Sequence, residues 1–375
     1  MRRGLRLLLS LLCFSALGFG QSPAGPPITQ VFGFFCNQGF TSCPLGFDPI
    51  LSPIQLSDGL LYVATFWGGQ GNPEFGGTIA RSSTTGQALV IHTFASLAGR
   101  FLGGENPAIG FVQGPDGAMY GVTQQGGTHN FGVMYKLART GQFQVLYNFC
   151  SLPACADGPG PITLAPDGNF YGVSGETFFR ITPQGVWAQL GRLPQSTGQN
   201  TRLILAADGN FYGAGPAEPI AFRETPSGQF TLLHQFSYPL FPSSNLMAAR
   251  DGNLYGATNG SGDGTGIFRL TPAGDFAFIH AMTENEGYEP VFLMQASDGN
   301  IWGLSSFRDG SFFSITLGGQ SLQSGAFSCA VTGCQPGGMI EGRDGNLYGT
   351  AISGGHVPGQ NPLGTIFKIA AGLPH

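Results

Sequence analysis

Asp344-Gly345-Asn346-Leu347-Tyr348-Gly349-Thr350 decides the fold, because six other segments of the chain repeat its pattern. Each copy begins with an Asp-Gly turn and places an aromatic residue four positions after the Asp. Such repetition indicates an array of equivalent supersecondary units. The turns begin at Asp58, Asp116, Asp167, Asp208, Asp251, Asp298 and Asp344, and the aromatics are Tyr62, Tyr120, Tyr171, Tyr212, Tyr255, Trp302 and Tyr348.

The spacing of the copies predicts four short strands in each unit. Successive turns lie about 48 residues apart on average, the length of a propeller blade. The copy around Asp167 shows strand patterns at 161–165, 170–174, 177–182 and 186–190. Its Asp-Gly-Asn turn joins the first two strands, and Thr182-Pro183-Gln184-Gly185 joins the last two.

The two ends of the chain complete one another. The last copy lacks a fourth strand, whereas residues 28–36 resemble the fourth strand at 144–150. The chain therefore predicts an all-β fold, a seven-bladed β-propeller of four-stranded antiparallel blades. We expect the N-terminal strand to complete the last blade, which removes exposed sheet edges.

Composition excludes some classes of partner. Gly (62) and Pro (26) are abundant, but their fixed places in the repeat favour a turn-rich β protein over a disordered one. Charged residues make up 10% of the chain and the net charge is −5. Without a basic stripe, nucleic acid is not expected as a partner.

The N-terminus has the pattern of a secretory signal. Arg2, Arg3 and Arg6 precede an apolar run at 7–17 that is short for a membrane span, and cleavage is expected before Gln21. Residues 1–20 are thus predicted to be a signal peptide and residues 21–375 a single propeller domain. We expect a monomer, secreted or held in the cell envelope, with no transmembrane segment after cleavage. Cys13 leaves lipid anchoring as an alternative.

Six further cysteines form three close pairs, each after an aromatic-rich strand. Because the same loop of the repeat carries a pair three times, we expect three local disulfides in an oxidising compartment. A zinc site is the alternative, but none of the pairs has the usual spacing of metal ligands. The pairs are Cys36 and Cys43, Cys150 and Cys155, and Cys329 and Cys334.

The repeats resemble the GloVer-type tandem repeats of exported bacterial propeller proteins. The closest match is 344–350 with Gly354-Gly355 and the strand 364–369. This resemblance spans the mature chain and implies a secreted or surface-attached propeller, but it implies no catalytic residues. A looser resemblance is to streptogramin-lyase-like propellers, which use a metal and a histidine base that no motif places here.

Two recurring residue types favour structural roles. A cation recurs in the third strand of six copies, as a solvated residue or as a partner for the turn Asp. Three histidines align in the fourth strand, two positions before an apolar residue, which also favours a scaffold role. The cations are Arg81, Lys136, Arg180, Arg223, Arg269 and Lys368, and the histidines are His92, His234 and His280.

The loops of one face are the expected site of function. In a four-stranded meander the 1–2 and 3–4 turns share one face and are tight here, whereas the variable 2–3 and 4–1 loops share the other. A rigid scaffold with variable loops places binding residues on those loops. The candidates for ligand binding are Trp67, Glu105, Asn106, His129, Glu286, Tyr288 and His356.

We therefore expect a binding or interaction module that contacts a glycan, peptide or protein ligand through this face without a cofactor. The alternative is an extracellular lyase or hydrolase with a divalent metal at the central funnel of the same face. Glu105, His129, Glu286 and His356 would then be metal ligands or the acid and base. Solvated loop polarity is the simpler interpretation, because no two of these residues have ligand spacing in sequence.

Overall fold

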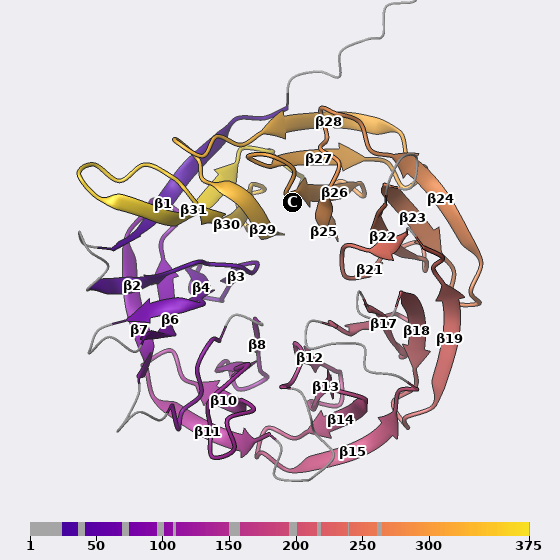
Figure 1. Cartoon of the computed structure of the whole chain (residues 1–375), viewed down its shortest axis with the longest axis horizontal. Coiled ribbons are helices and arrows are strands. Elements are labelled where there is room, and N and C mark those ends of the chain that lie inside the picture. The colour runs from indigo at the N-terminus through magenta and orange to yellow at the C-terminus, as the bar shows by residue number, and fades with distance from the viewer. Residues whose placement is uncertain are drawn as a thin grey trace, which may run out of the picture.

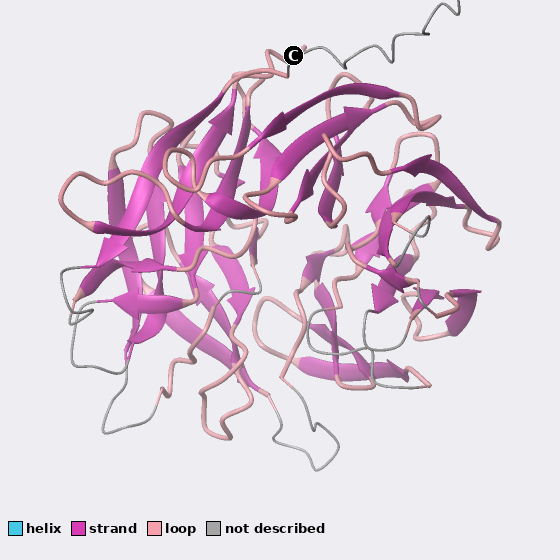
Figure 2. Ribbon diagram, turned by 45° about the horizontal axis from the view of Figure 1, so that its top comes forward, coloured by secondary structure: helices cyan, strands magenta, loops and turns pink. Residues whose placement is uncertain are grey.

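Seven sheets surround a central axis in the computed structural model of the chain (Figure 1). It describes residues 25–36, 42–69, 75–95, 101–107, 110–149, 158–194, 201–215, 219–238, 240–260 and 265–374. Every regular secondary-structure element in these ranges is a β-strand (Figure 2), so the described part contains no helix suited to crossing a membrane. The expected signal peptide, residues 1–20, lies outside the described residues.

The first four blades follow one another along the chain, each from its inner to its outer strand. Blade 1 contains β3 (Ile54–Gln55), β4 (Leu61–Thr65), β6 (Phe75–Ser82) and β7 (Ala88–Ala95). Blade 2 contains β8 (Phe111–Gln113), β9 (Met119–Val122), β10 (Val133–Leu137) and β11 (Phe143–Asn148). Blade 3 contains β12 (Thr163–Leu164), β13 (Phe170–Ser174), β14 (Thr177–Ile181) and β15 (Trp187–Arg192). Blade 4 contains β16 (Ile204–Leu205), β17 (Phe211–Gly215), β18 (Ile220–Glu224) and β19 (Phe230–Gln235).

The last three blades complete the ring. Blade 5 contains β21 (Met247–Ala248), β22 (Leu254–Asn259), β23 (Gly266–Leu270) and β24 (Phe276–Ala281), and β20 (Phe241–Pro242) also pairs with β22. Blade 6 contains β25 (Pro290–Gln295), β26 (Ile301–Ser305), β27 (Ser311–Ile315) and β28 (Ser321–Ala326). Blade 7 contains β29 (Cys334–Glu341), β30 (Leu347–Ser353), β31 (Asn361–Ile369) and β1 (Ile28–Cys36). A separate two-stranded sheet pairs β2 (Cys43–Phe47) with β5 (Trp67–Gly69).

The N-terminal strand closes the ring, as the sequence predicted. β1 pairs antiparallel with β31, with Ile28 opposite Ile369 and Cys36 opposite Asn361. Just before β1, the Gly25 N–H donates to Ser324 O of β28 at 3.0 Å, which joins the N-terminal segment to blade 6 as well. Head and tail therefore share a blade, and β31 presents no open edge.

Each Asp-Gly turn is held by its own Asp, as the turn of blade 3 illustrates. Asp167 Oδ1 accepts from the Asn169 N–H at 3.0 Å, and Oδ2 accepts from the Tyr171 hydroxyl at 2.8 Å. Gly168 takes a φ of +79°, a conformation that favours glycine. The same Asp-to-aromatic hydrogen bond occurs in every blade, with the Trp302 indole as donor in blade 6.

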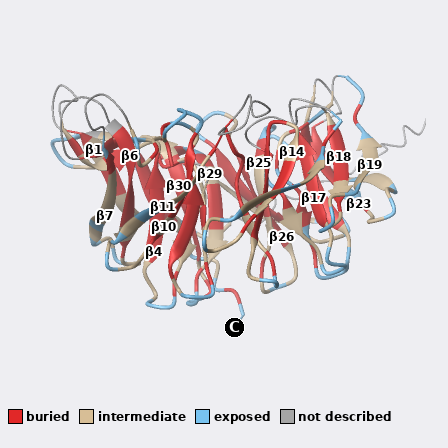
Figure 3. Ribbon diagram, turned by 90° about the horizontal axis from the view of Figure 1, so that it is seen from below, coloured by how far each residue is buried: buried red, intermediate tan, exposed pale blue. Residues whose placement is uncertain are grey.

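The repeated aromatics pack between neighbouring sheets, and all seven are buried. The strand β17, which carries Tyr212, is buried along its whole length (Figure 3). Tyr171 of blade 3, for example, lies 4.5 Å from Phe211 of blade 4 between ring centroids. The glycine after the aromatic leaves room for a third-strand ring, because a Cβ on Gly172 would overlap the ring of Phe179 directly opposite. Blade 1 lacks this glycine and reverses the sizes, with Val63 opposite Ala80.

Candidate functional site

On the face formed by the Asp-Gly turns, the polar side chains of the repeat pair with one another. In six of the seven blades the repeated aromatic is the direct cross-strand partner of the repeated cation, as in Tyr120 opposite Lys136. Lys136 Nζ lies 2.6 Å from Asp116 Oδ2, and Lys368 Nζ lies 3.6 Å from Asp344 Oδ2. Burial raises the pKa of Asp116, but hydrogen bonds from Lys136, Ala118 and Tyr120 outweigh it and lower that pKa. In these two blades the cation is a partner of the turn Asp, as one of the sequence interpretations proposed.

Blade 6 departs from this pattern in two linked positions. Trp302 replaces the tyrosine, and Ser314 stands opposite it where the other blades have a cation. Both side chains are buried, so the larger indole is accommodated by a smaller neighbour. The loss of the cation therefore reflects packing.

The aligned histidines are structural groups of the outer strands. His92 of β7 stacks on Phe143 of the next blade at 4.0 Å between ring centroids, and His234 stacks on Phe276 in the same way. Burial lowers the pKa of His92 to about 4 and also lowers that of His234, so both rings stack in the neutral form near pH 7. These contacts couple neighbouring blades.

His280 occupies the equivalent position but pairs with a candidate site residue. His280 Nε2 donates to Glu286 Oε2 at 2.9 Å, and its Nδ1 donates to Gly319 O at 2.9 Å. Glu286 also accepts from the hydroxyls of Thr283 and Ser321 and is only 3% exposed. These hydrogen bonds occupy the carboxylate inside the wall between blades 5 and 6, so it is poorly placed to meet an external ligand.

The charges of this pair follow from the hydrogen bonds. Burial raises the pKa of Glu286, but the donors His280, Ser321 and Thr283 outweigh it and lower the pKa to about 2. Burial lowers the pKa of His280, yet the hydrogen bond and charge of Glu286, with the Gly319 carbonyl, raise it above its usual value. The pair is therefore a buried carboxylate–imidazolium ion pair in mildly acidic solution.

The other enzymatic candidates lie in different blades. Glu105 is half-buried in the loop from blade 1 to blade 2, where its backbone pairs with Gln125. His129 is exposed in the 2–3 loop of blade 2, and His356 is exposed in that of blade 7, where its N–H donates to Gln30 of β1. Among the described residues, no group of three or more His, Cys, Asp or Glu side chains is placed to hold a metal ion.

Asn106 supports a loop from inside. It is 3% exposed and has a positive φ of 57°. Its N–H donates to Gly76 O at 2.8 Å, and its carbonyl accepts from the Gln124 N–H. Its backbone thus ties the first 4–1 loop to β6 of blade 1 and to the 2–3 loop of blade 2.

Two disulfides lie in 4–1 loops, on the face where the sequence predicted the site of function. Cys36 bonds to Cys43 between blades 7 and 1, and Cys329 bonds to Cys334 between blades 6 and 7. These two predicted pairings are confirmed. Cys150 and Cys155 lie outside the described residues.

An aromatic cleft opens on this face beside blade 6. The blade-6 cleft has a volume of about 660 Å³ and is lined by Glu284, Asn285, Phe307, Arg308, Asp309 and Phe327, among others. Tyr288, 42% exposed, packs edge-on against Phe307 at 5.4 Å, and the Arg308 guanidinium lies 5.1 Å from the same ring. Across the loops, Arg308 lies 3.6 Å from Glu284.

Trp67 is the second exposed aromatic among the predicted residues. It begins β5, is 40% exposed and packs edge-on against Phe66 at 4.9 Å between ring centroids. Trp67 belongs to the two-stranded sheet of β2 and β5, whereas Tyr288 lies in the loop between blades 5 and 6. Trp67 and Tyr288 therefore lie in two different aromatic patches.

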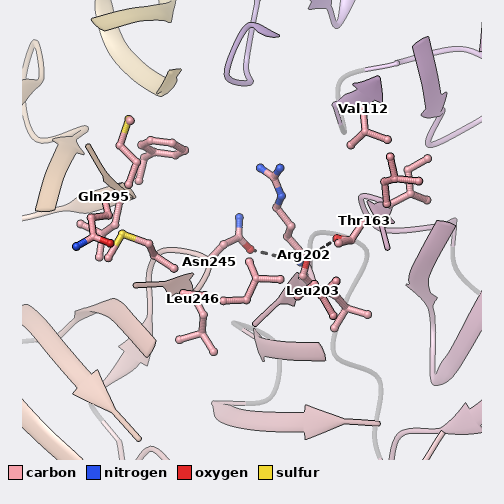
Figure 4. Close-up of a pocket in the computed structure, with 16 residues that line it drawn as sticks. Val112, Thr163, Arg202, Leu203, Asn245, Leu246 and Gln295 are labelled. Atoms are coloured by element: carbon pink, nitrogen blue, oxygen red, sulfur yellow. Dashed lines mark hydrogen bonds between the residues drawn. The ribbon is translucent and has the colours of Figure 1, made fainter. Parts of the chain in front are cut away.

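Sequence reasoning missed the mouth of the central channel. One residue of each blade, six positions before the Asp, lies in the inner strand or one or two residues before it. The set is Ser52, Gly110, Pro161, Arg202, Asn245, Phe292 and Gly338. Two adjoining cavities of about 580 and 360 Å³ share Arg202, Asn245 and Phe292 in their walls. Figure 4 shows Arg202 and Asn245 in the larger of the two. An alignment of the repeats at this position would have shown Arg202 as the single charged member.

The fold defines the chain as a seven-bladed β-propeller, and the repeats define its family. Residues 34–218 and 241–373 match the Gloeobacter/Verrucomicrobia repeat family, and the chain belongs to that family. No curated protein matches the chain.

Solved structures with the same fold include two lyases. A streptogramin B lyase is 16% identical, with a TM-score of 0.63 over 92% of this chain and 97% of that one. Virginiamycin B lyase from Staphylococcus aureus is 15% identical, with a TM-score of 0.61 over 91% and 98%. The extracellular domain of the putative hybrid two component system BT4673 from B. thetaiotaomicron is 12% identical, with a TM-score of 0.58 over 90% of this chain and 39% of that one. At these identities the likeness shows the fold alone.

Proposed function

We propose that the protein is an extracellular or cell-envelope binding module whose ligand contacts the face formed by the 2–3 and 4–1 loops. The observation that carries this proposal is the blade-6 cleft, where Phe307 and Arg308 line an open volume of about 660 Å³ and the exposed Tyr288 packs against Phe307. Exposed aromatic and arginine side chains supply much of the affinity at binding surfaces. By contrast, the Asp residues of the opposite face accept hydrogen bonds from their own turns.

The disulfides support both parts of this proposal, the extracellular location and the use of this face for binding. Both described bridges lie in 4–1 loops, so they stiffen the loops that would meet a ligand. Rigid binding loops lose less conformational entropy when a ligand binds. Disulfides also persist mainly in oxidising compartments, which agrees with the export expected from residues 1–20.

Glycan and peptide arrays probed with the purified protein would test this function. Tyr288→Ala should weaken binding to the selected ligand by roughly tenfold or more, because it removes an exposed ring beside the cleft. Phe278→Ala is a matched control, since Phe278 is 47% exposed but lies on the outer strand β24. Unchanged binding by Tyr288→Ala, or equal losses in both variants, would contradict the proposal.

Metal analysis of the same protein distinguishes the enzymatic alternative. A stoichiometric divalent metal that is lost in His129→Ala would favour a metal-assisted lyase or hydrolase on this face. Hydrolysis or elimination of an array ligand during incubation would favour the same alternative.

A further inference from the structure

Arg202 stands alone at the mouth of the central channel. It lies two residues before β16, the inner strand of blade 4, and its guanidinium extends away from Leu203 into the open space between the blades (Figure 4). The side chain is exposed, and no described residue accepts a hydrogen bond or ion pair from it. The backbone of Arg202 is fixed, because its N–H donates to Asn245 Oδ1 at 3.3 Å.

The neighbouring Asn245 offers a second donor. Its side-chain oxygen is occupied by the Arg202 N–H, so the amide nitrogen is left to face the same space (Figure 4). Asn245 occupies the position of blade 5 that Arg202 occupies in blade 4. A guanidinium and an amide NH₂ therefore face the same two cavities, and both are donors.

The surroundings supply no negative charge and much apolar surface. None of the described residues that line the two channel cavities is Asp or Glu, although the whole chain has a net charge of −5. The walls beside Arg202 include Ile162, Leu246, Phe292 and Met294. A cation near apolar walls without a counter-ion favours an anion that enters from outside.

We propose that the channel mouth binds a small organic carboxylate, with the carboxylate on Arg202 and Asn245 and an apolar body against the channel wall. Guanidinium groups bind carboxylates through two parallel hydrogen bonds, and the amide adds a third donor. The adjoining volumes of about 580 and 360 Å³ suit a ligand of this size.

The charge balance favours a carboxylate over a phosphate. One arginine neutralises one negative charge, whereas a phosphate monoester near pH 7 brings close to two. The second charge would be desolvated among apolar residues without a partner, which is unfavourable. This site is separate from the blade-6 cleft, so either one can exist without the other.

Titration calorimetry with octanoate, octanamide, octyl phosphate and inorganic phosphate would test the assignment. Octanoate should bind the wild-type protein at least roughly tenfold more tightly than octanamide, which has the same apolar chain without the charge. Arg202→Gln should remove this preference, and Arg202→Lys should retain part of it. Arg192→Gln is the matched control, since Arg192 lies on the outer strand β15 and pairs with Glu176.

Asn245→Asp is a variant that should keep the fold while it neutralises the positive charge of the Arg202 guanidinium. The new carboxylate retains an acceptor for the Arg202 N–H but also places a negative charge beside the guanidinium. Octanoate binding should therefore be lost while the melting temperature stays near that of the wild type. Equal binding of octanoate and octanamide, octanoate binding that survives Arg202→Gln, or tighter binding of octyl phosphate or inorganic phosphate would overturn the proposal.

Discussion

Glu286 shows how one side chain can look functional in sequence and be structural in the fold. It lies in a polar loop next to Tyr288, and that pattern made it a candidate for binding or catalysis. In the structure its carboxylate instead accepts hydrogen bonds from His280, Thr283 and Ser321. His92 and His234 stack on Phe143 and Phe276, but Ser321 stands at the equivalent place beside His280, which leaves room for the carboxylate.

The buried ion pair predicts a definite pH dependence. The low folded pKa of Glu286 stabilises the protein above its unfolded value of 4.5, and this is lost as the pH falls towards 2. The raised pKa of His280 stabilises it below 6.5, and this is lost as the pH rises through the folded value. Glu286→Gln should therefore lower the free energy of unfolding most between about pH 4.5 and 6.5, by roughly 3 kcal/mol.

Urea denaturation at pH 5.5 and pH 9 would measure this effect. The cost of Glu286→Gln should be smaller at pH 9, because His280 carries less positive charge as the pH rises through its raised pKa. Glu284→Gln is the control from the same loop, because Glu284 and Arg308 are both well exposed and their pair contributes little. An equal cost of Glu286→Gln at both pH values would show that the ion pair is not the cause.

The outer strand is the element that joins each blade to the next. Its aromatic residues stack across the gap, as Tyr147 does on Trp187 of blade 3 with their rings 7° from parallel. The glycine of each 3–4 turn then packs on the backbone of the preceding outer strand, as Gly228 does on Leu190. The repeats predicted these turns and strands, but not their contacts, because a period fixes positions within a blade and not which atoms meet between blades.

Two glycines with similar backbone conformations allow the energetic cost of a contact between blades to be distinguished from the cost of backbone strain in the turn. Gly228 has a φ of +87° and Gly209 a φ of +80°, so alanine is strained at both. A Cβ on Gly228 would overlap Leu190 O, whereas nothing lies within 4 Å of a Cβ on Gly209. Gly228→Ala should therefore destabilise the protein by about 2 kcal/mol more than Gly209→Ala in thermal or urea unfolding. Equal losses would indicate that blades 3 and 4 do not touch there.

The molecule as a whole is a ring whose closure could be predicted from sequence, because residues 28–36 repeat the missing fourth strand. The Asp-Gly turns and buried aromatics followed from the same repeat, and so did the two described disulfides. The candidate site was harder to predict. Loops without a period carry Tyr288 and Phe307, and their meeting depends on two connections of unequal length. Arg202 was missed because its meaning depends on the apolar residues that other blades place around it.

The antiparallel strand order of each blade sets the described 2–3 and 4–1 loops on one face, and hydrogen–deuterium exchange would test most directly whether that face binds. The measurement compares the free protein with the protein saturated by the ligand that the arrays select. The account predicts slower exchange at residues 284–289 and 306–310, beside the blade-6 cleft. Protection confined to the Asp-Gly turns or to the outer strands would contradict it.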